Sequence, residues 1–170
     1  MANSFFRRQL GLYASVHRDA RNKATHFIGI PMIVFSLLLA LTQWQMQVAG
    51  HHTSAAAMLA LIAVLGWMTL DLGVGIAMGA VMLVMWYAAE ALAGALGTPS
   101  SVWIGFAALF VFGWALQFLG HHYEGKRPAL VDNLFQGFIG PMFLVAEVMV
   151  VNGYRRDLAN SVAQGDVTTL

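Results

Sequence analysis

Residues 102–122 have the sequence VWIGFAALFVFGWALQFLGHH. Its apolar part, from Val102 to Leu119, is followed by two adjacent histidines, His121 and His122. The hydrocarbon core of a bilayer is about 30 Å thick and a helix rises about 1.5 Å per residue, so about 20 mostly apolar residues can cross it. This stretch therefore predicts a transmembrane helix that ends in imidazole groups at the membrane surface.

Similar apolar runs occur earlier in the chain and predict three more spanning helices, at about Phe27–Gln43, Ala55–Leu70 and Val74–Leu96. The segments between the four spans are predicted to be a polar loop and two tight turns: Gln45–Ser54, Asp71–Gly73 and Gly97–Ser100. Four crossings return the chain to the side of the membrane on which it starts.

Two shorter apolar segments flank these spans. Ser4–Val16 mixes Phe and Leu with Arg and Gln, which favours an amphipathic helix in the membrane interface over a frayed polar tail. Phe138–Val151 is interrupted by Gly140 and Pro141 and is short for a crossing. We therefore expect this last segment to form a re-entrant or interfacial helix.

The composition supports an all-α integral membrane bundle. Hydrophobic residues make up 59% of the chain and charged residues 10%, whereas soluble domains carry about 25% charged residues. With 170 residues, the chain is predicted to form a single membrane domain, residues 1–170. The absence of cysteine excludes disulfides and thiolate ligands, and a net charge of +1 gives no indication of a nucleic-acid partner.

The positive charges predict the orientation of the chain. With a cytoplasmic N-terminus, four crossings and no fifth, every Lys and Arg lies on the cytoplasmic side, as the positive-inside rule expects. The first apolar run is long enough to span, so the N-terminal segment is not predicted to be a signal peptide. We expect a bacterial inner membrane protein with a cytoplasmic N-terminus.

Four histidines are predicted to meet on this cytoplasmic face. His17 and His26 precede the first span, and His121 and His122 follow the fourth. On one continuous helix, His17 and His26 would point in opposite directions, so both can reach one centre only if the chain bends between them. A continuous helix would instead align Asp19 with His26. Both geometries stay open, as does the alternative that these are boundary histidines without a role.

Other polar residues lie near these histidines in the sequence. Asn22 is a candidate N-cap of the first span. Gln117, His121 and Glu124 share one face if the fourth helix continues, so Glu124 could bind a metal or orient an imidazole. Glu147 lies in the last apolar run, where an ionisable group is costly, and is expected to pair with an Arg or a His of the site.

Further polar and small residues receive structural interpretations. His51 and His52 fall on the opposite membrane face and are expected to have no part in the site. Glu90 lies near the far end of the third span and is expected to reach the interface. Gly75 and Gly79 form a GxxxG pair that favours close helix packing within the chain over dimerisation.

The segments that carry these residues resemble the signatures of a known family. His17, Asn22 and His26, followed by Ile28-Gly-Ile-Pro31, resemble its N-terminal signature. Two more signatures are matched by Trp114-Ala-Leu-Gln-Phe-Leu-Gly-His121 with Glu124-Gly-Lys-Arg-Pro-Ala-Leu130, and by Pro141-Met-Phe143 with Glu147. The chain resembles, over nearly its whole length, the small membrane proteins whose fungal endoplasmic-reticulum member is an iron(II)-dependent 2-hydroxy fatty acid dioxygenase.

The resemblance implies an oxidoreductase that uses Fe(II) and O2 to shorten a long-chain 2-hydroxy fatty acid by one carbon. It implies the following site residues: His17, His26, His121 and His122 as metal ligands, Asn22 and Glu124 as catalytic residues, and Asp19, Gln117 and Glu147 as supporting residues. It leaves open whether His121 or His122 is the main ligand. We expect the substrate carboxylate to be held by basic residues on the same face, namely Arg18, Arg21, Lys126 and Arg127.

Two other function classes stay open on the sequence alone. A two-metal lipid hydroxylase or desaturase would need more ligands than this chain offers. A non-enzymatic membrane scaffold or carrier would use its histidines only to cap helices. Histidine sites accept zinc, nickel or copper as readily as iron, so residue spacing does not identify the metal, and nothing in the sequence indicates the oligomeric state.

Overall fold

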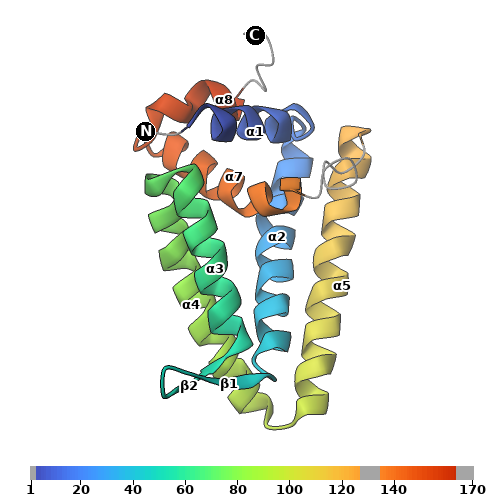
Figure 1. Cartoon of the computed structure of the whole chain (residues 1–170). Coiled ribbons are helices and arrows are strands. Elements are labelled where there is room, and N and C mark those ends of the chain that lie inside the picture. Colours follow the sequence, from blue (N-terminus) through green and yellow to red (C-terminus); the bar gives the residue numbers. More distant parts are fainter. Residues whose placement is uncertain (1–2, 127–134, 164–170) are drawn as a thin grey trace.

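A computed structural model describes residues 3–126 and 135–163, which form an all-helical bundle with a short β-hairpin (Figure 1). Its body consists of four helices that run side by side: α2 (Ala20–Leu41), α3 (Ala55–Leu70), α4 (Leu72–Leu96) and α5 (Pro99–Glu124). The membrane-type helical bundle that the hydropathy predicts is thereby confirmed.

The four helices differ in their capacity to cross a bilayer. α2, α4 and α5 have 22, 25 and 26 residues and are long and apolar enough to span. α3 has the predicted bounds, but its 16 residues rise only about 24 Å, less than the hydrocarbon core. α2 and α5 extend past the predicted apolar runs, so the polar ends that carry His26 and His121 are helical.

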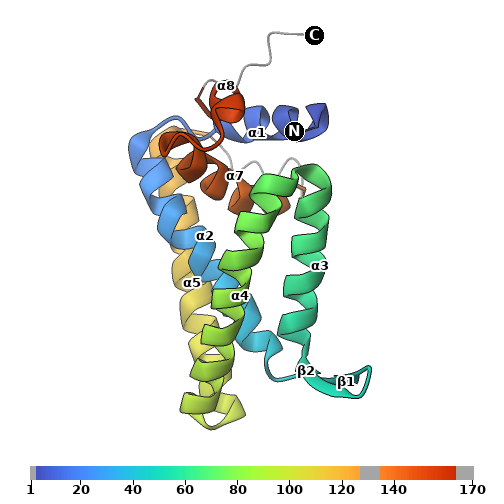
Figure 2. The same cartoon turned by 90° about the vertical axis from the view of Figure 1, so that its left-hand side faces the viewer.

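A layer of helices lies across one end of the bundle, at the top of Figure 1 and again in Figure 2. This end layer consists of α1 (Ser4–Ser15), α7 (Phe135–Val151) and α8 (Ala159–Ala163), with the 3-10 turn η1 (Arg156–Leu158) before α8. α1 confirms the predicted N-terminal helix. α7 lies across the bundle end, as expected for an apolar helix that is not a fifth parallel span, and it meets the η1–α8 segment at a bend of 120°.

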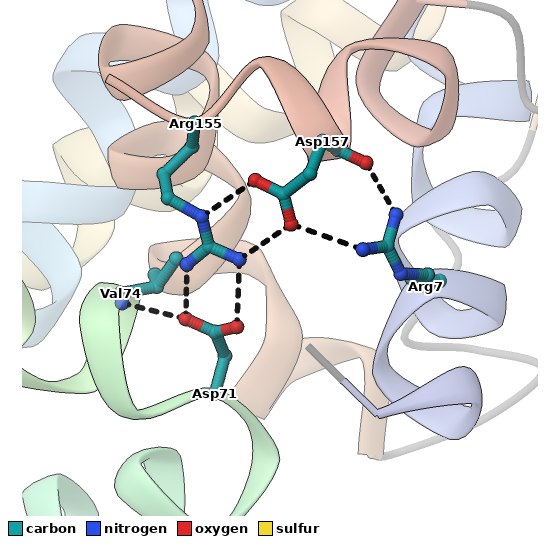
Figure 3. Close-up of polar contacts among 5 residues, drawn as sticks. All are labelled: Arg7, Asp71, Val74, Arg155 and Asp157. Carbon is teal, nitrogen blue, oxygen red and sulfur yellow. Dashed lines mark hydrogen bonds and ion pairs between the residues drawn. The ribbon is translucent and has the colours of Figure 1, made fainter. Parts of the chain in front are cut away.

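Ion pairs fasten the end layer to the turn between α3 and α4 (Figure 3). Arg155, which follows α7, forms a two-point ion pair with Asp71, and its Nη2 lies 2.8 Å from Asp71 Oδ2. Asp157 pairs with Arg155 at 2.8 Å and with Arg7 of α1 at 3.0 Å. Asp71 also caps α4 by accepting the Val74 N–H at 2.8 Å. One charge network therefore links α1, α7 and the bundle.

The segment predicted to be a polar loop is instead an antiparallel hairpin of β1 (Gln45–Val48) and β2 (His51–Ser54). The two residues between the strands, Ala49 and Gly50, have positive φ angles of 51° and 82°. Two positive φ values are what a two-residue hairpin turn requires. The hairpin lies at the end of the bundle opposite the end layer (Figure 1).

Glycines allow the helices to approach closely. A Cβ atom on Gly29 of α2 would lie 2.9 Å from the carbonyl oxygen of Gly113 in α5, too near for any larger residue. On the other side of the bundle, a Cβ atom on Gly75 of α4 would lie 2.7 Å from the Cα of Met68 in α3. The predicted packing of Gly75 within the chain is thus confirmed. The close pairing of α2 with α5 brings the first turns of α2 against the last turns of α5.

Candidate metal centre

Three histidines from three segments of the chain meet beside the end layer. His17 lies in the linker between α1 and α2, His26 lies in α2, and His121 lies near the C-terminal end of α5. Their ligand nitrogens lie within 4.8 Å of one another, and all three side chains are buried. Because metal–nitrogen bonds are about 2.0–2.1 Å long, small side-chain rotations bring all three onto one ion.

A break in the chain makes this convergence possible. α1 ends at Ser15 and α2 begins at Ala20, so His17 belongs to neither helix. Of the two geometries that the sequence leaves open, the structure has the bent one. The ring centroid of His17 lies 4.5 Å from that of His26 and 5.0 Å from that of His121.

The start of α2 differs from the prediction that Asn22 is its N-cap. The N-cap is Asp19, whose side chain accepts the Arg21 N–H at 2.8 Å. Asn22 is fully buried, and its Nδ2 donates to Val16 O at 3.2 Å and to Glu124 Oε2 at 3.1 Å. The Asn22 side chain is thus hydrogen-bonded to the Glu124 carboxylate of α5, and Asp19 caps α2 instead.

Glu124 holds the linker that carries His17. Its carboxylate accepts the backbone N–H of Arg18 at 2.9 Å and that of Asp19 at 2.8 Å, besides the Asn22 amide. Hydrogen bonds to an ionised carboxylate are roughly twice as strong as those between neutral groups. This carboxylate therefore fastens the end of α5 to the linker immediately after His17.

Hydrogen bonds on the far side of two imidazole rings set which nitrogen can bind a metal. His17 Nδ1 lies 2.7 Å from the carbonyl oxygen of Tyr13, and His26 Nδ1 lies 2.9 Å from that of Asn22. A carbonyl only accepts, so each Nδ1 carries a proton and each Nε2 keeps a lone pair. Among the described residues, His17 Nε2 and His121 Nδ1 are buried without any partner. A buried polar atom without a partner costs free energy, and a ligand bound at these two atoms would remove that cost.

The environment also keeps His17 in the form that binds metal ions. The pKa of His17 is lowered from 6.5 to about 3, first because burial disfavours the charged ring and second because His26 lies beside it. The Tyr13 ring stacks on the His17 ring with centroids 3.9 Å apart, which fixes its orientation. Only a neutral imidazole has the lone pair that a metal needs, so His17 is available at neutral pH.

The remaining histidines lie outside this cluster: His122, which was predicted to be a ligand, and His51 and His52, which were not. His122 is exposed, whereas His121, its neighbour in sequence, is buried. His51 and His52 are exposed in β2, at the opposite end of the bundle (Figure 1). In the described ranges 3–126 and 135–163, His17, His26 and His121 form the one group of three or more potential ligands.

Two of the basic residues expected to hold a substrate carboxylate, Arg21 and Lys126, have protein partners. Arg21 Nη2 lies 2.9 Å from Asp19 Oδ2, and its guanidinium lies over the Tyr123 ring. Lys126 donates to the carbonyl oxygen of Ser15 at 2.7 Å. The last of the set, Arg127, lies outside the described residues.

Glu147 and Gln117 were both predicted to support the site, but only Gln117 lines the cavity beside the histidines. Glu147 of α7 pairs with a lysine, Lys23, at 2.6 Å, rather than with an Arg or a His. Gln117 is buried one turn before His121 on α5 and lines a cavity that also touches the histidines.

That cavity has a volume of about 170 Å³ and extends from the three histidines between α2, α5 and α7. Most of its wall is apolar and includes Ile30, Ile33, Val34, Leu37 and Pro141. A second, polar cavity of about 410 Å³ reaches His17 beside Arg18 and Lys23. The candidate metal cluster therefore borders a mostly apolar cavity on one side and a polar cavity on another.

The sequence interpretation missed the cavity wall apart from the histidines and Gln117, including its polar and aromatic members Tyr13, Trp114 and Gln136. Trp114, Gln117 and His121 are spaced i, i+3 and i+7, so the face of α5 that carries a predicted ligand could have indicated Trp114. Gln136 belongs to no local pattern, and only the placement of α7 across the bundle brings it to the site.

Comparisons with known proteins show what this chain is similar to in sequence. The family model described as "Mpo1-like: 2-hydroxy-palmitic acid dioxygenase Mpo1-like" matches residues 3–152. The 2-hydroxy-palmitic acid dioxygenase MPO1 of Saccharomyces cerevisiae is 30% identical to this chain over 150 residues, which cover 87% of this chain and 82% of the yeast protein. No solved structure gives a significant match.

Proposed function

The chain belongs to the Mpo1-like family, as its signatures predict, and we propose that it is an iron(II)-dependent dioxygenase of long-chain 2-hydroxy fatty acids. The observation that carries this proposal is the convergence of His17, His26 and His121 at one end of an apolar cavity. The substrate class follows the activity for which the yeast relative is named.

The three histidines fit a first-row transition metal. The lone pairs on Nε2 of His17 and His26, together with the His121 ring, offer three neutral nitrogen ligands to one ion. Imidazole suits iron, zinc, copper and nickel, and three ligands leave positions open for other molecules. Bound iron(II) would supply the electrons that activate O2 and a positive centre for the hydroxyl and carboxylate of the substrate.

Asn22 and Glu124 serve in this proposal as positioning residues. Both contact the linker that carries His17, and neither lines the apolar cavity. Outer hydrogen bonds that fix metal ligands commonly change metal affinity by about 10–100-fold. The expected effect of these two side chains is therefore on the placement of His17.

The proposed reaction is balanced by one O2 per substrate. The bond between C1 and C2 breaks, C1 leaves as CO2, and C2 becomes the carboxyl carbon of an acid one carbon shorter. O2 accepts the four electrons that C1 and C2 lose, and the products are the shortened acid, CO2 and one water. The apolar cavity receives the part of the acyl chain that lies next to the head group.

The charged end of the molecule is proposed to face the cytoplasm of a bacterial inner membrane. The described Lys and Arg residues lie in or next to the end layer and the neighbouring helix ends, which fits the positive-inside rule. The chain has no cysteine, so single-cysteine variants test this directly. In intact cells an impermeant maleimide should label Gln47→Cys in β1 and spare Arg8→Cys in α1, and the reverse labelling would overturn the orientation.

The activity is tested with purified protein in detergent, loaded with iron(II) without oxygen and then given air and 2-hydroxypalmitate. Mass spectrometry should detect the acid that is one carbon shorter, with one iron per chain, and the product should be lost in His121→Ala and kept in His51→Ala. Two irons per chain would favour a two-metal hydroxylase or desaturase. Neither product nor bound metal would favour a scaffold or carrier.

A further inference from the structure

We infer that two buried glutamines, Gln117 and Gln136, bind the polar head group in the cavity and distinguish a 2-hydroxy acid from a plain fatty acid. Gln117 belongs to α5 and Gln136 to α7, and both line the cavity that the three histidines line. Their exposed fractions are 7% and 4%, so both amides are more than nine-tenths buried. The inference rests on the proposed function and names its specificity residues.

Each amide presents an atom without a partner. Gln117 Nε2 and Gln136 Oε1 are buried and make no hydrogen bond to any described residue. A buried polar atom that lacks a partner costs free energy, and the great majority of such atoms in proteins are paired. Trp114 Nε1, a donor on the same face of α5, is also buried in this wall without a partner among the described residues. Away from the histidines, Tyr13 and Trp114 the wall is apolar, so the two amide atoms are suited to contact polar atoms of a bound molecule.

The two free atoms have opposite hydrogen-bonding character. Gln136 Nε2 donates to the Gln9 side chain of α1, so the Gln136 amide turns its oxygen, an acceptor, away from that contact. Gln117 Nε2 is a donor. A 2-hydroxy acid carries acceptor oxygens on C1 and a hydroxyl donor on the adjacent C2. The carboxylate therefore matches Gln117, and the 2-hydroxyl matches Gln136.

The position of the amides agrees with this assignment. Gln117 lies one turn before His121 on the same face of α5, about 6 Å along the helix axis. A head group held at the histidines is thus within reach of the Gln117 amide. Neutral amides are also cheaper to bury in an apolar cavity than charged groups, and neither Arg21 nor Lys126 lines it.

Hydroxyl recognition of this kind gives strong discrimination. A site built to hydrogen-bond a substrate hydroxyl rejects an analogue that lacks it, because the protein atom is then left unpaired. Palmitate would leave Gln136 Oε1 without a donor, whereas 2-hydroxypalmitate supplies one. The contact between Gln9 and Gln136 makes Gln9 a positioning residue for this recognition.

The test measures equilibrium binding of 2-hydroxypalmitate and of palmitate to the full-length protein in lipid nanodiscs, under nitrogen so that no turnover occurs. The wild type should prefer the hydroxy acid. Gln136→Met should reduce that preference by about tenfold while palmitate binding is kept, because one hydrogen bond is lost. Gln117→Met should weaken both ligands about equally, by about tenfold. The control is Gln43→Met, just past the C-terminal end of α2 and outside the cavity wall, which should change the binding of neither ligand.

The outcomes separate this inference from the proposed function. If wild-type protein converts 2-hydroxypalmitate but Gln136→Met keeps its full preference for the hydroxy acid, the inference is wrong and the function stands. If the wild type prefers the hydroxy acid and Gln136→Met does not, but no shortened acid ever forms with iron and O2, the recognition stands and the dioxygenase proposal falls. If Gln136→Met fails to fold, Gln9→Met gives the same test. It should lower the preference for the hydroxy acid, because the Gln136 amide loses the contact that orients it. An unchanged preference in Gln9→Met would overturn the inference.

Discussion

The two ends of this bundle carry the same polar residue types in opposite settings. Beside the end layer, His17, His26 and His121 are buried and face one another from three segments of the chain. At the hairpin end, His51 and His52 are neighbours in sequence but are exposed on one strand. Proximity of histidines in the sequence therefore does not indicate a site in this protein. The candidate site arises where imidazoles from separate segments are buried together.

The glutamates at the two ends show the same contrast. Glu124 accepts two backbone N–H groups from the linker that carries His17. Glu90, near the hairpin, accepts the Ser54 hydroxyl and the Trp86 indole N–H. Both carboxylates are satisfied by protein donors, but only the first is bonded to the backbone beside a candidate ligand.

The largest expected difference between the two ends is in metal binding. His17→Ala, His26→Ala or His121→Ala should each abolish stoichiometric metal binding, because two imidazoles hold an ion much less well than three. His51→Ala and the exposed His122→Ala should leave it unchanged. The measurement is metal content per folded chain after reconstitution and desalting. Full metal content in a folded His121→Ala protein would remove the basis of the proposed site.

A second comparison replaces one glutamate at each end. Glu124→Gln should lower metal affinity by about 10–100-fold, because the linker that positions His17 loses its charged acceptor. Glu90→Gln should have no effect on metal affinity. Competition with a chromophoric chelator measures both constants under the same conditions. Equal affinities in the two variants would contradict the positioning role of Glu124.

A third comparison uses glycines. A methyl group on Gly120 of α5 would meet the Thr25 hydroxyl and the Asn22 side chain, and would lie 2.9 Å from His26 Nδ1. Gly120→Ala should therefore destabilise the protein by about 1–3 kcal/mol. Gly94 of α4 has open space around it, so Gly94→Ala should stabilise by about 0.5–1 kcal/mol. Thermal unfolding in one detergent measures both, and a stable Gly120→Ala protein would show that α5 does not approach α2 this closely.

The smallest expected effect concerns the charge network under the end layer. The pKa of Asp157 is lowered from 3.8 to about 2, mainly by hydrogen bonds from Arg155. The pKa of Asp71 is also lowered, because burial alone would raise it but hydrogen bonds from Arg155 and the Val74 N–H outweigh that. Carboxyl groups with lowered pKa values stabilise the fold above their unfolded pKa, and this stabilisation is lost as the pH falls from about 4 towards 2.

The midpoint of thermal unfolding should accordingly begin to fall below about pH 6.5, where His17 binds a proton in the unfolded chain but not in the folded one, and should fall more steeply below about pH 4, where the two carboxyl groups add their effect. Asp157→Asn should cost about 1 kcal/mol or less at pH 7, since the pair is partly exposed, and should make the acid limb shallower. Circular dichroism in an acid-stable detergent follows both. An unfolding midpoint that rises on acidification would show that the network does not stabilise the folded chain.

Local chemistry made much of the fold predictable. The apolar run Ala55–Leu70 has the bounds of α3 because strong end signals flank it, Ser54 before and Asp71 after. The turn between α4 and α5 is likewise predictable, since Gly97 takes a left-handed φ of 72° and Thr98 caps the next helix. Such features depend on a few neighbouring residues and on the length that a bilayer imposes.

Features that depend on distant partners were not predictable. Asn22 matched an N-cap pattern, but Glu124, 102 positions away, binds its side chain. Gln136 has no motif, and its place in the cavity depends on how α7 lies across the bundle. The hairpin was missed because its turn is Ala49-Gly50 rather than the Asn-Gly or Asp-Gly pair that favours positive φ at both positions.

The origin of the three histidines in separate segments has a consequence for biogenesis. Chains fold from the N-terminus during synthesis, so His17 and His26 emerge long before His121, which lies near the C-terminal end of α5, the last of the three long apolar helices. The three-nitrogen cluster cannot exist until α5 has been inserted and paired with α2. Metal uptake by the full cluster is therefore a late event, and a loaded molecule is one whose membrane topology is already complete.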